Sequence, residues 1–263
     1  MPKLDHKFNR FVKNSWVNFT SRYGTTVLHP QFIVKNNSQF AIKLAKKYIH
    51  GKLLDIGCGT MSYRKQVEPL VDTYVGLDYP LTSKAYKTKL KPDIKANAKN
   101  IPVADESFDS VLMLQVLEHI DDPLAALKEA NRILKKGEYL ILSTPFMYPI
   151  HDSPNDYFRY TQYSLKKLFK DSGFKVQKIY SKGSFLEFWL QSLIVFSLIR
   201  TKDLLWAKSS PASVAQLLIM LTLICFYPLF NIIVITLIPA LSLLTPNLPN
   251  GFPLIYVAVA KKP

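Results

Sequence analysis

The sequence predicts an α/β fold with a largely parallel sheet, and three features support this. Residues 52–56 form a short apolar run, typical of a buried strand, that ends in a Gly57-Cys58-Gly59 turn. Helical spacing resumes at Met61, and a second apolar run ends in Asp78 about twenty residues beyond the glycines. Glycines let a ligand approach the backbone, and an acidic strand end accepts hydrogen bonds from a ribose. We therefore expect a nucleoside cofactor.

The residues around the turn narrow the cofactor class. A dinucleotide site has a third glycine under a pyrophosphate, but Ser62 stands at that position. Asp55 would repel a pyrophosphate and suits the ammonium group of a methionine. The stretch 55–60, followed by Tyr63 and Arg64, resembles motif I of class I S-adenosyl-L-methionine (SAM) dependent methyltransferases, methyltransferase type 11-like. It is similar to a subgroup with a hydrophobic insertion before the last strand, often associated with surface-glycan assembly.

The resemblance implies a Rossmann-like seven-stranded methyltransferase sheet of order 3-2-1-4-5-7-6 with helices on both faces, and SAM as cofactor. It assigns the methionine end of SAM to Asp55, the ribose to Asp78 and Tyr79, and the adenine to Asn97 and Ala98. Many relatives have Asp at the position of Asn97, whose carbonyl can still accept from the adenine amino group. The implied cofactor-binding residues are Asp55, Gly57, Cys58, Gly59, Asp78, Tyr79, Asn97, Ala98 and Gln115.

Composition sets broader limits. A chain of 263 residues can hold one α/β domain and an addition. The formal net charge of +15, with its basic excess in the first hundred residues, is compatible with nucleic acid, an anionic membrane surface or solubility. Cys58 and Cys225 form no disulfide framework, which favours a reducing, cytoplasmic setting. Residues 1–5 lack the apolar core of a secretory signal.

The N-terminal segment, residues 1–37, has two interpretations. Large apolar residues recur at helical spacing, with basic residues opposite; the apolar ones are Leu4, Phe8, Phe11, Val12, Trp16 and Phe19. This pattern suits a helix lying on a membrane surface. It equally suits a lid helix packed over the cofactor site, as in related methyltransferases. A further helix is expected over residues 39–49, ended by Gly51.

The middle of the chain alternates strands and helices. We expect strands at residues 93–97, 107–115 and 139–143, with a helix that starts at Asp122-Pro123 and ends with a C-cap at Gly137. In quinone-making relatives a Glu-Val-x-Glu-His stretch binds a divalent metal. Here Gln115 replaces the first glutamate and leaves Glu118 and His119. The sequence therefore predicts no metal site, with His119 packed at the helix start.

The loop over residues 149–161 follows the fifth strand and is dense in His, Asp, Tyr and Arg. Ligands of open α/β sheets lie beyond the carboxyl ends of strands, so we expect this loop to line the acceptor side. His151 is the candidate base, because its ordinary pKa lies near neutral pH. Asp156 and Arg159 are further acceptor-side candidates. In the structural alternative, these two residues pair to brace the loop and Thr161 caps the next helix.

The last two strands, expected at residues 174–180 and 254–260, enclose an insertion, residues 184–251. No charged residue occurs between Lys208 and Lys261, so its helices have little polar face. Because both flanking strands belong to one sheet, a single membrane crossing is excluded. We expect a bent helical hairpin, divided at Pro228, that enters the cytoplasmic leaflet and returns. Two crossings or a soluble dimer burying this surface are the alternatives.

The predicted domains are thus residues 1–37, a SAM-binding domain of residues 38–183 and 252–263, and the insertion. The expected function is O-methylation of a glycan, lipid-linked sugar or lipid-like acceptor at the cytoplasmic face of a membrane. One alternative is a catalytically silent membrane-anchored SAM-binding scaffold, against which the intact Asp55, Gly57, Gly59 and Asp78 argue. The other is an RNA methyltransferase, motivated by charge. An Asn-Pro-Pro-Tyr type motif of DNA methyltransferases is absent, and nucleic acid is not the expected partner.

Overall fold

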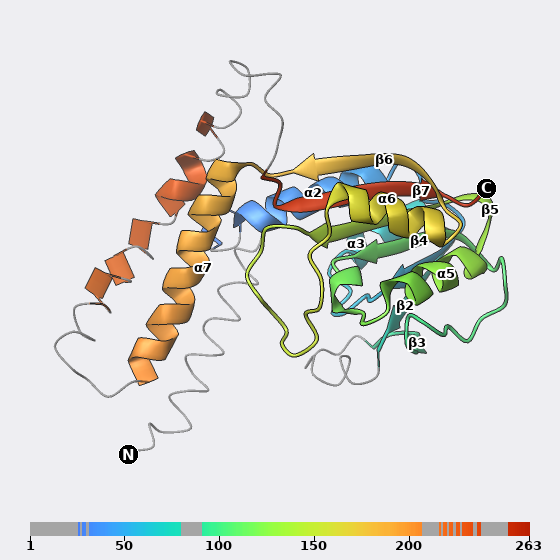
Figure 1. The fold of residues 1–263 in the computed structure, drawn as a ribbon, viewed down its shortest axis with the longest axis horizontal. Coiled ribbons are helices and arrows are strands. Elements are labelled where there is room, and N and C mark those ends of the chain that lie inside the picture. The colour runs from blue at the N-terminus through green and yellow to red at the C-terminus, as the bar shows by residue number, and fades with distance from the viewer. Residues whose placement is uncertain are drawn as a thin grey trace. The chain divides into compact units, whose positions relative to one another are not determined.

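The computed structural model describes residues 32–79, 91–206 and 252–263, positions 26, 28 and 29, and separate positions between 216 and 237. Its centre is a seven-stranded sheet of order β3-β2-β1-β4-β5-β7-β6, as the sequence predicted (Figure 1). The strands are β1 Lys52–Ile56, β2 Thr73–Asp78, β3 Ile94–Lys95, β4 Phe108–Leu114, β5 Leu134–Pro145, β6 Lys175–Lys182 and β7 Ile255–Lys261. Strands β1 to β5 pair in parallel, whereas β7 runs antiparallel to β5 and β6.

Helices cover both faces of this sheet. The described helices are α2 Phe32–Ala45, α3 Arg64–Val67, α5 Pro123–Ile133, α6 Gln162–Asp171 and α7 Phe185–Trp206, with 3-10 turns η1 Glu68–Leu70 and η2 Leu117–His119; α7 belongs to a separate compact unit. Figure 1 shows α5 and α6 on one face and α2 on the other. The side chain of Asp122 caps α5 by accepting from the Ala125 N–H, and Thr161 caps α6 by accepting from Ser164.

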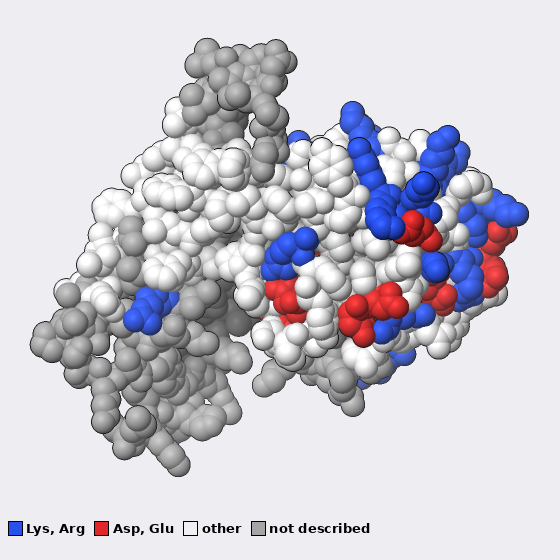
Figure 2. Space-filling view, in the orientation of Figure 1, with Lys and Arg blue, Asp and Glu red and all other residues white. Residues whose placement is uncertain are grey.

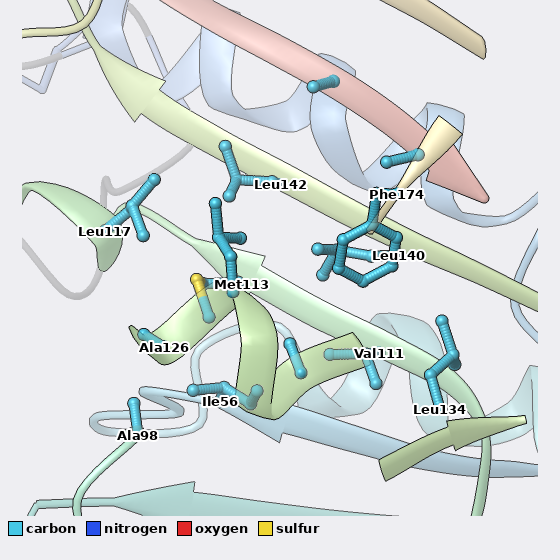
Figure 3. Close-up of a cluster of buried hydrophobic side chains, with 14 of the residues drawn as sticks. Ile56, Ala98, Val111, Met113, Leu117, Ala126, Leu134, Leu140, Leu142 and Phe174 are labelled. Atoms are coloured by element: carbon cyan, nitrogen blue, oxygen red, sulfur yellow. The ribbon is translucent and has the colours of Figure 1, made fainter. Parts of the chain in front are cut away.

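The core between the sheet and helices α5 and α6 follows the two-residue period of the strands (Figure 3). Alternate positions of the central strands point to this side and are fully buried: Leu54, Ile56, Val111, Met113, Leu140 and Leu142. They meet apolar side chains of the two helices, such as Leu127 and Phe169. Each such side chain contributes about 1.5–3 kcal/mol on burial. This packing fixes the carboxyl ends of β1, β2 and β4 at one edge.

Two helix predictions need correction. The helix expected at 39–49 is α2, which begins at Phe32 and ends at Ala45. The helix expected from Met61 is short, because α3 gives way to η1, where Pro69 occupies an early helical position. Both changes leave the order of elements as predicted.

The predicted C-cap at Gly137 is wrong. Helix α5 ends at Ile133, and Leu134 already has extended backbone and pairs with Phe108 as the first residue of β5. The backbone N–H groups of Glu106 and Ser107 donate to the last two carbonyls of α5, which fixes the point where the chain leaves the helix. Gly137 instead lies within β5, where its N–H donates to Lys262.

The chain divides into two compact units: Met1–Asn36 with Phe185–Pro249, and Asn37–Ser184 with Asn250–Pro263. The second unit contains the sheet. In the first, the buried Asn231 donates its side-chain amide to the His29 carbonyl at 3.2 Å, although 202 residues separate them. The predicted N-terminal helix, which includes Leu4 to Phe19, residues 80–90 and parts of the insertion, among them 207–215 and 238–251, lie outside the described residues.

Within the described part of the chain, no helix combines the length and the apolar character needed to cross a bilayer.

Candidate active site

The glycine turn closes the carboxyl end of β1. Gly57 and Gly59 have φ of 71° and 52°, a region that favours glycine. A Cβ atom on Gly57 would lie 2.4 Å from a methyl group of Val116. The N–H groups of Gly57 and Cys58 both donate to the Leu77 carbonyl, at 2.8 and 3.0 Å, which ties the turn to the end of β2. Beside it lies a cavity of about 200 Å³ lined by Asp55, Gly57, Cys58, Gly59, Thr60, Ser62, Tyr63 and Leu114.

Asp55 provides a buried carboxylate in this cavity. Its Oδ2 accepts a hydrogen bond from the Tyr74 hydroxyl at 2.6 Å. Burial raises the pKa of Asp55 to about 6, although the bond from Tyr74 opposes this shift. The carboxyl is therefore mostly ionised at neutral pH, in surroundings where water screens its charge poorly. It suits an ammonium group.

Asp78, the last residue of β2, is 5% exposed. Its Oδ1 accepts the N–H of Tyr79 at 2.7 Å, whereas its buried Oδ2 has no hydrogen-bond partner among the described residues. Burial raises the pKa of Asp78, and the N–H groups of Tyr79 and Gly59 lower it. Buried polar atoms without partners are rare in native proteins. A ligand hydroxyl donating to Oδ2 would satisfy this one.

Two other predicted cofactor-binding side chains, those of Asn97 and Gln115, already have hydrogen-bond partners within the protein. Asn97 is exposed, and its side-chain oxygen accepts from the Lys99 N–H at 3.0 Å, while Ala98 is buried in the core. Gln115 has a φ of 58°, uncommon for a residue with a Cβ, and its side-chain amide donates to Ser143. Asn97 and Ala98 follow the end of β3 and Gln115 follows the end of β4, so both segments lie at the carboxyl edge of the sheet.

A larger hollow of about 410 Å³ lies between α6 and β6 and is lined by lysines and Phe174. It includes none of the predicted site residues. We therefore place the chemistry at the glycine turn.

The loop after β5 is braced internally. Asp156 is paired with Arg159 by two bonds of 2.6 and 2.7 Å and accepts the backbone N–H of His151 at 2.9 Å. Arg159 also donates to the carbonyls of Tyr148 and Pro149. These bonds hold the pKa of Asp156 well below its ordinary value. The structural alternative predicted from the sequence is thus present: Asp156 and Arg159 pair and brace the loop, and Thr161 caps α6.

His151 is half-buried at the centre of this brace. Its Nδ1 lies 3.2 Å from the Pro149 carbonyl and 3.3 Å from the Asp156 carboxylate. Nδ1 also lies 3.4 Å from an Arg159 nitrogen, which would require an unprotonated Nδ1. We assign the proton to Nδ1, because two oxygens lie closer than the nitrogen. Burial lowers the pKa of His151, against the effect of Asp156, so the neutral ring carries its lone pair on Nε2.

The same loop folds over η2. The backbone N–H groups of Tyr157 and Phe158 donate to the Glu118 carbonyl, and the Tyr160 hydroxyl donates to Leu117. His119 lies 2.7 Å through Nδ1 from the Asn155 carbonyl, and its ring meets the His151 ring edge-on at 4.8 Å between centroids. The side chain of Glu118 is completely buried beneath these rings.

Comparison with known proteins supports a methyltransferase domain in the sheet region. Residues 54–142 match a protein family described as a methyltransferase domain. This match and the order of the sheet support a class I SAM-dependent methyltransferase domain. Its cofactor is SAM, and the free Oδ2 of Asp78 and the carboxylate of Asp55 fit the ribose and the ammonium group of that molecule.

Curated relatives of the methyltransferase domain include enzymes of quinone synthesis. The chain is 37% identical over 100 residues to ubiquinone biosynthesis O-methyltransferase of Dinoroseobacter shibae, covering 35% of this chain and 40% of the relative. It is 32% identical over 136 residues to demethylmenaquinone methyltransferase of Staphylococcus haemolyticus, covering 47% and 57%. The chain thus spans about half the length of the curated relatives it matches.

Solved structures share the fold. A SAM dependent methyltransferase from Archaeoglobus fulgidus superposes with a TM-score of 0.54 at 18% identity, covering 94% of this chain and 99% of that one. The [4+2]-cyclase SpnF superposes with a TM-score of 0.53 at 17% identity, covering 86% and 80%. Because a cyclase has this fold too, the fold of the methyltransferase domain alone does not decide the reaction.

The residues of the site that were not among the sequence candidates include Tyr74, Leu114 and Glu118. Tyr74 reaches Asp55 because it lies on β2 opposite Leu53, two residues before the partner of Asp55. Leu114 lines the cavity as the last residue of β4. Glu118 was set aside with the metal motif, although it is fully buried under the acceptor-side loop. The first two follow from strand register, whereas the burial of Glu118 depends on how the loop folds back.

Proposed function

We propose that the chain transfers the methyl group of SAM to a hydroxyl group of an acceptor that is bound beside the loop over residues 149–161. One observation carries the proposal. Two buried carboxylates suited to SAM, Asp55 and Asp78, lie at the carboxyl edge of the sheet from which the His151 loop also emerges. O-methylation is supported by a relative named ubiquinone biosynthesis O-methyltransferase.

In this proposal the protein aligns two reactants. Asp55 receives the ammonium group and Asp78 the ribose, which fixes the methyl group of SAM. SAM supplies an already activated methyl, so the acceptor oxygen displaces it directly. The Nε2 atom of His151 is available to take the hydroxyl proton, because Nδ1 carries its own. Asp156 and Arg159 act by holding that ring, at 3.3 and 3.4 Å from Nδ1.

We further propose that the acceptor is a glycan, lipid-linked sugar or lipid-like molecule met at the cytoplasmic face of a membrane. Large apolar side chains are exposed on α7 and on the described positions beyond it: Phe185, Trp189, Phe196, Leu218, Ile219, Leu221, Phe226, Leu229, Ile232 and Leu237. Figure 2 shows few charged side chains over the described part of α7 and many around α5 and α6. Exposed apolar surface of this extent is typical of an interaction site.

Labelled methyl transfer tests the reaction. Membranes, soluble extract and total RNA are each incubated with the purified chain and SAM labelled in its methyl group. We expect label in the lipid-extractable or glycan fraction of the membranes. Label in RNA would replace the proposed acceptor by nucleic acid. No label in any fraction, with SAM bound, would favour the silent scaffold.

The pKa of Asp55 predicts a pH dependence of SAM binding. An ammonium group binds the ionised carboxylate, so protonation of Asp55 opposes binding as the pH falls through its pKa of about 6. We expect affinity to be level near neutral pH and to fall by up to about tenfold per pH unit in the acid range below that pKa. Calorimetry across that range measures it. Asp55→Asn should bind more weakly and lose the pH dependence; an unchanged profile would contradict the role of Asp55.

Replacement of the insertion tests the membrane proposal. The ends of β6 and β7 are already adjacent, since Lys182 pairs with Ile255 and accepts the Leu254 N–H at 2.7 Å. A short turn in place of residues 184–250 should therefore leave the sheet intact. We expect the full chain to stay with membranes through high-salt and carbonate washes and the shortened chain to be soluble and bind SAM.

A double substitution that keeps the chain at full length complements the replacement of the insertion. Trp189→Ser and Phe196→Ser together remove two side chains that are 55% and 57% exposed, without shortening the chain. They should weaken membrane retention and leave SAM binding unchanged. A full chain that is soluble without detergent would exclude the membrane proposal.

A further inference from the structure

We propose that Glu118, His119 and His151 form a binding site for a divalent transition-metal ion such as Zn²⁺, at the acceptor side of the domain. The three residues come from η2 and from the loop after β5, and one ligand atom of each lies within 4.8 Å of the other two. The sequence predicted no metal site, because Gln115 stands where a third ligand was expected. The fold supplies a different third donor, His151.

Glu118 gives the first argument for a ligand. Its side chain is completely buried, and its Oε2 lies 3.4 Å from the Thr144 hydroxyl. Its Oε1 has no hydrogen-bond partner among the described residues. A carboxylate oxygen at such a position is costly unless it is paired or coordinates a metal. Nε2 of His119 lies 3.8 Å from Oε1, beyond hydrogen-bond distance.

The two histidines give the second argument, which is independent of the first. Nδ1 of His119 lies 2.7 Å from the Asn155 carbonyl, which can only accept, so Nδ1 carries the proton. Nδ1 of His151 lies beside the Pro149 carbonyl and the Asp156 carboxylate. Both rings therefore present the lone pair of Nε2. Metal-binding histidines are typically held in this way, with the other nitrogen donating to a carbonyl or carboxylate.

The size and chemistry of the cluster fit a small cation. Zn²⁺ binds imidazole and carboxylate at about 2.0–2.2 Å, so its ligand atoms stand roughly 3.4 Å apart. The three ligand atoms lie within 4.8 Å of one another, so binding an ion requires them to move closer together. Two nitrogens and one oxygen favour Zn²⁺, Co²⁺ or Fe²⁺ over Mg²⁺, which takes oxygen ligands. The rings are 23% and 29% exposed, which leaves coordination positions open to an acceptor.

A cation here supplies Lewis-acid polarisation of an acceptor oxygen. His151 then uses its Nε2 lone pair as a ligand and takes no proton, so the two roles of His151 exclude each other in one molecule. The metal proposal concerns binding by this chain and does not depend on the proposed acceptor.

Metal titration tests the proposal directly. Untagged full-length protein is stripped with a chelator and titrated with Zn²⁺ by calorimetry, and Co²⁺ is added separately to record its visible absorption. We expect one Zn²⁺ per chain, a Co²⁺ spectrum of nitrogen and oxygen ligation, and no comparable binding of Mg²⁺. Loss of an outer-shell partner alone lowers metal affinity about 10–100-fold, so His119→Ala and His151→Ala should each lose at least about tenfold.

Matched variants separate a site from incidental binding. Glu118→Gln keeps the size of the buried side chain and should also weaken Zn²⁺ binding. His50→Ala removes an exposed histidine that faces Glu138 at 3.3 Å before β1, and it should bind Zn²⁺ as the parent does. SAM affinity, measured in every variant, shows that the domain is folded. Parent protein that binds no Zn²⁺, or binding that survives both histidine substitutions, would overturn the proposal while leaving the SAM site in place.

Discussion

Asp78→Ala should lower the affinity for SAM by at least about 100-fold, since it removes both carboxylate oxygens at the end of β2. Each hydrogen bond to a charged group contributes about 1.5–3 kcal/mol, and two ribose hydroxyls would donate to this carboxylate. Its Oδ2 is buried without a partner among the described residues, so in the absence of ligand the group destabilises the fold. The unfolding temperature of the variant should therefore hold or rise. Calorimetry for SAM and a thermal melt measure the two effects.

The control for this substitution lies on the same stretch of chain. Asp72 precedes β2 at its opposite end and is exposed, so Asp72→Ala should bind SAM as the parent does. Asp78→Asn keeps one acceptor oxygen and should fall between the parent and Asp78→Ala. A folded Asp78→Ala variant with unchanged SAM affinity would exclude the assignment of Asp78 to the ribose.

The sheet was predictable because its signals are local. Each central strand is a short apolar run, and the Gly57–Gly59 turn needs backbone angles that glycine favours. The order of the strands came from resemblance to the methyltransferase family, and it is confirmed. The end of α5 was not predictable in this way. Lys135, Lys136 and Gly137 look like a helix C-terminus, but backbone bonds to Glu106 and Ser107 draw the chain into β5 earlier.

The cofactor side of the site was easier to predict than the acceptor side. Asp55 and Asp78 stand at strand ends, where position along the strand places the side chain. Glu118, His119 and His151 come together because backbone N–H groups of the loop donate to the Glu118 carbonyl of η2, across about forty residues, which no local sequence pattern records. His151 was assigned to the acceptor side from the position of its loop after the fifth strand and from the polar residues in that loop. The hydrogen-bond partners of His151 and the orientation of its Nε2 could be known only from the folded structure.

His151→Ala should lower turnover about 100-fold while SAM affinity stays within a few-fold, because general acid–base groups contribute about 10²–10⁴-fold. The ring lies in the loop after β5, and its contacts are with Asp156, Arg159, Pro149 and the His119 ring, none of which lines the cofactor cavity. Single-turnover transfer of labelled methyl, with SAM affinity measured in parallel, gives both quantities.

Two further variants, His50→Ala and Arg159→Ala, serve as comparisons for His151→Ala. His50→Ala should retain the parent rate, because His50 lies before β1 at the opposite edge of the sheet. Arg159→Ala keeps the His151 side chain but removes the two hydrogen bonds from Arg159 to Asp156, which supports the His151 ring. It should lower turnover less than His151→Ala, through a ring that is less well held. If His151→Ala transfers methyl at the parent rate, the loop serves the fold alone. If a chelator lowers the turnover of the parent protein as much as His151→Ala does, His151 acts by binding a metal ion. If His151→Ala lowers turnover while the parent protein is insensitive to chelator, His151 takes the acceptor proton.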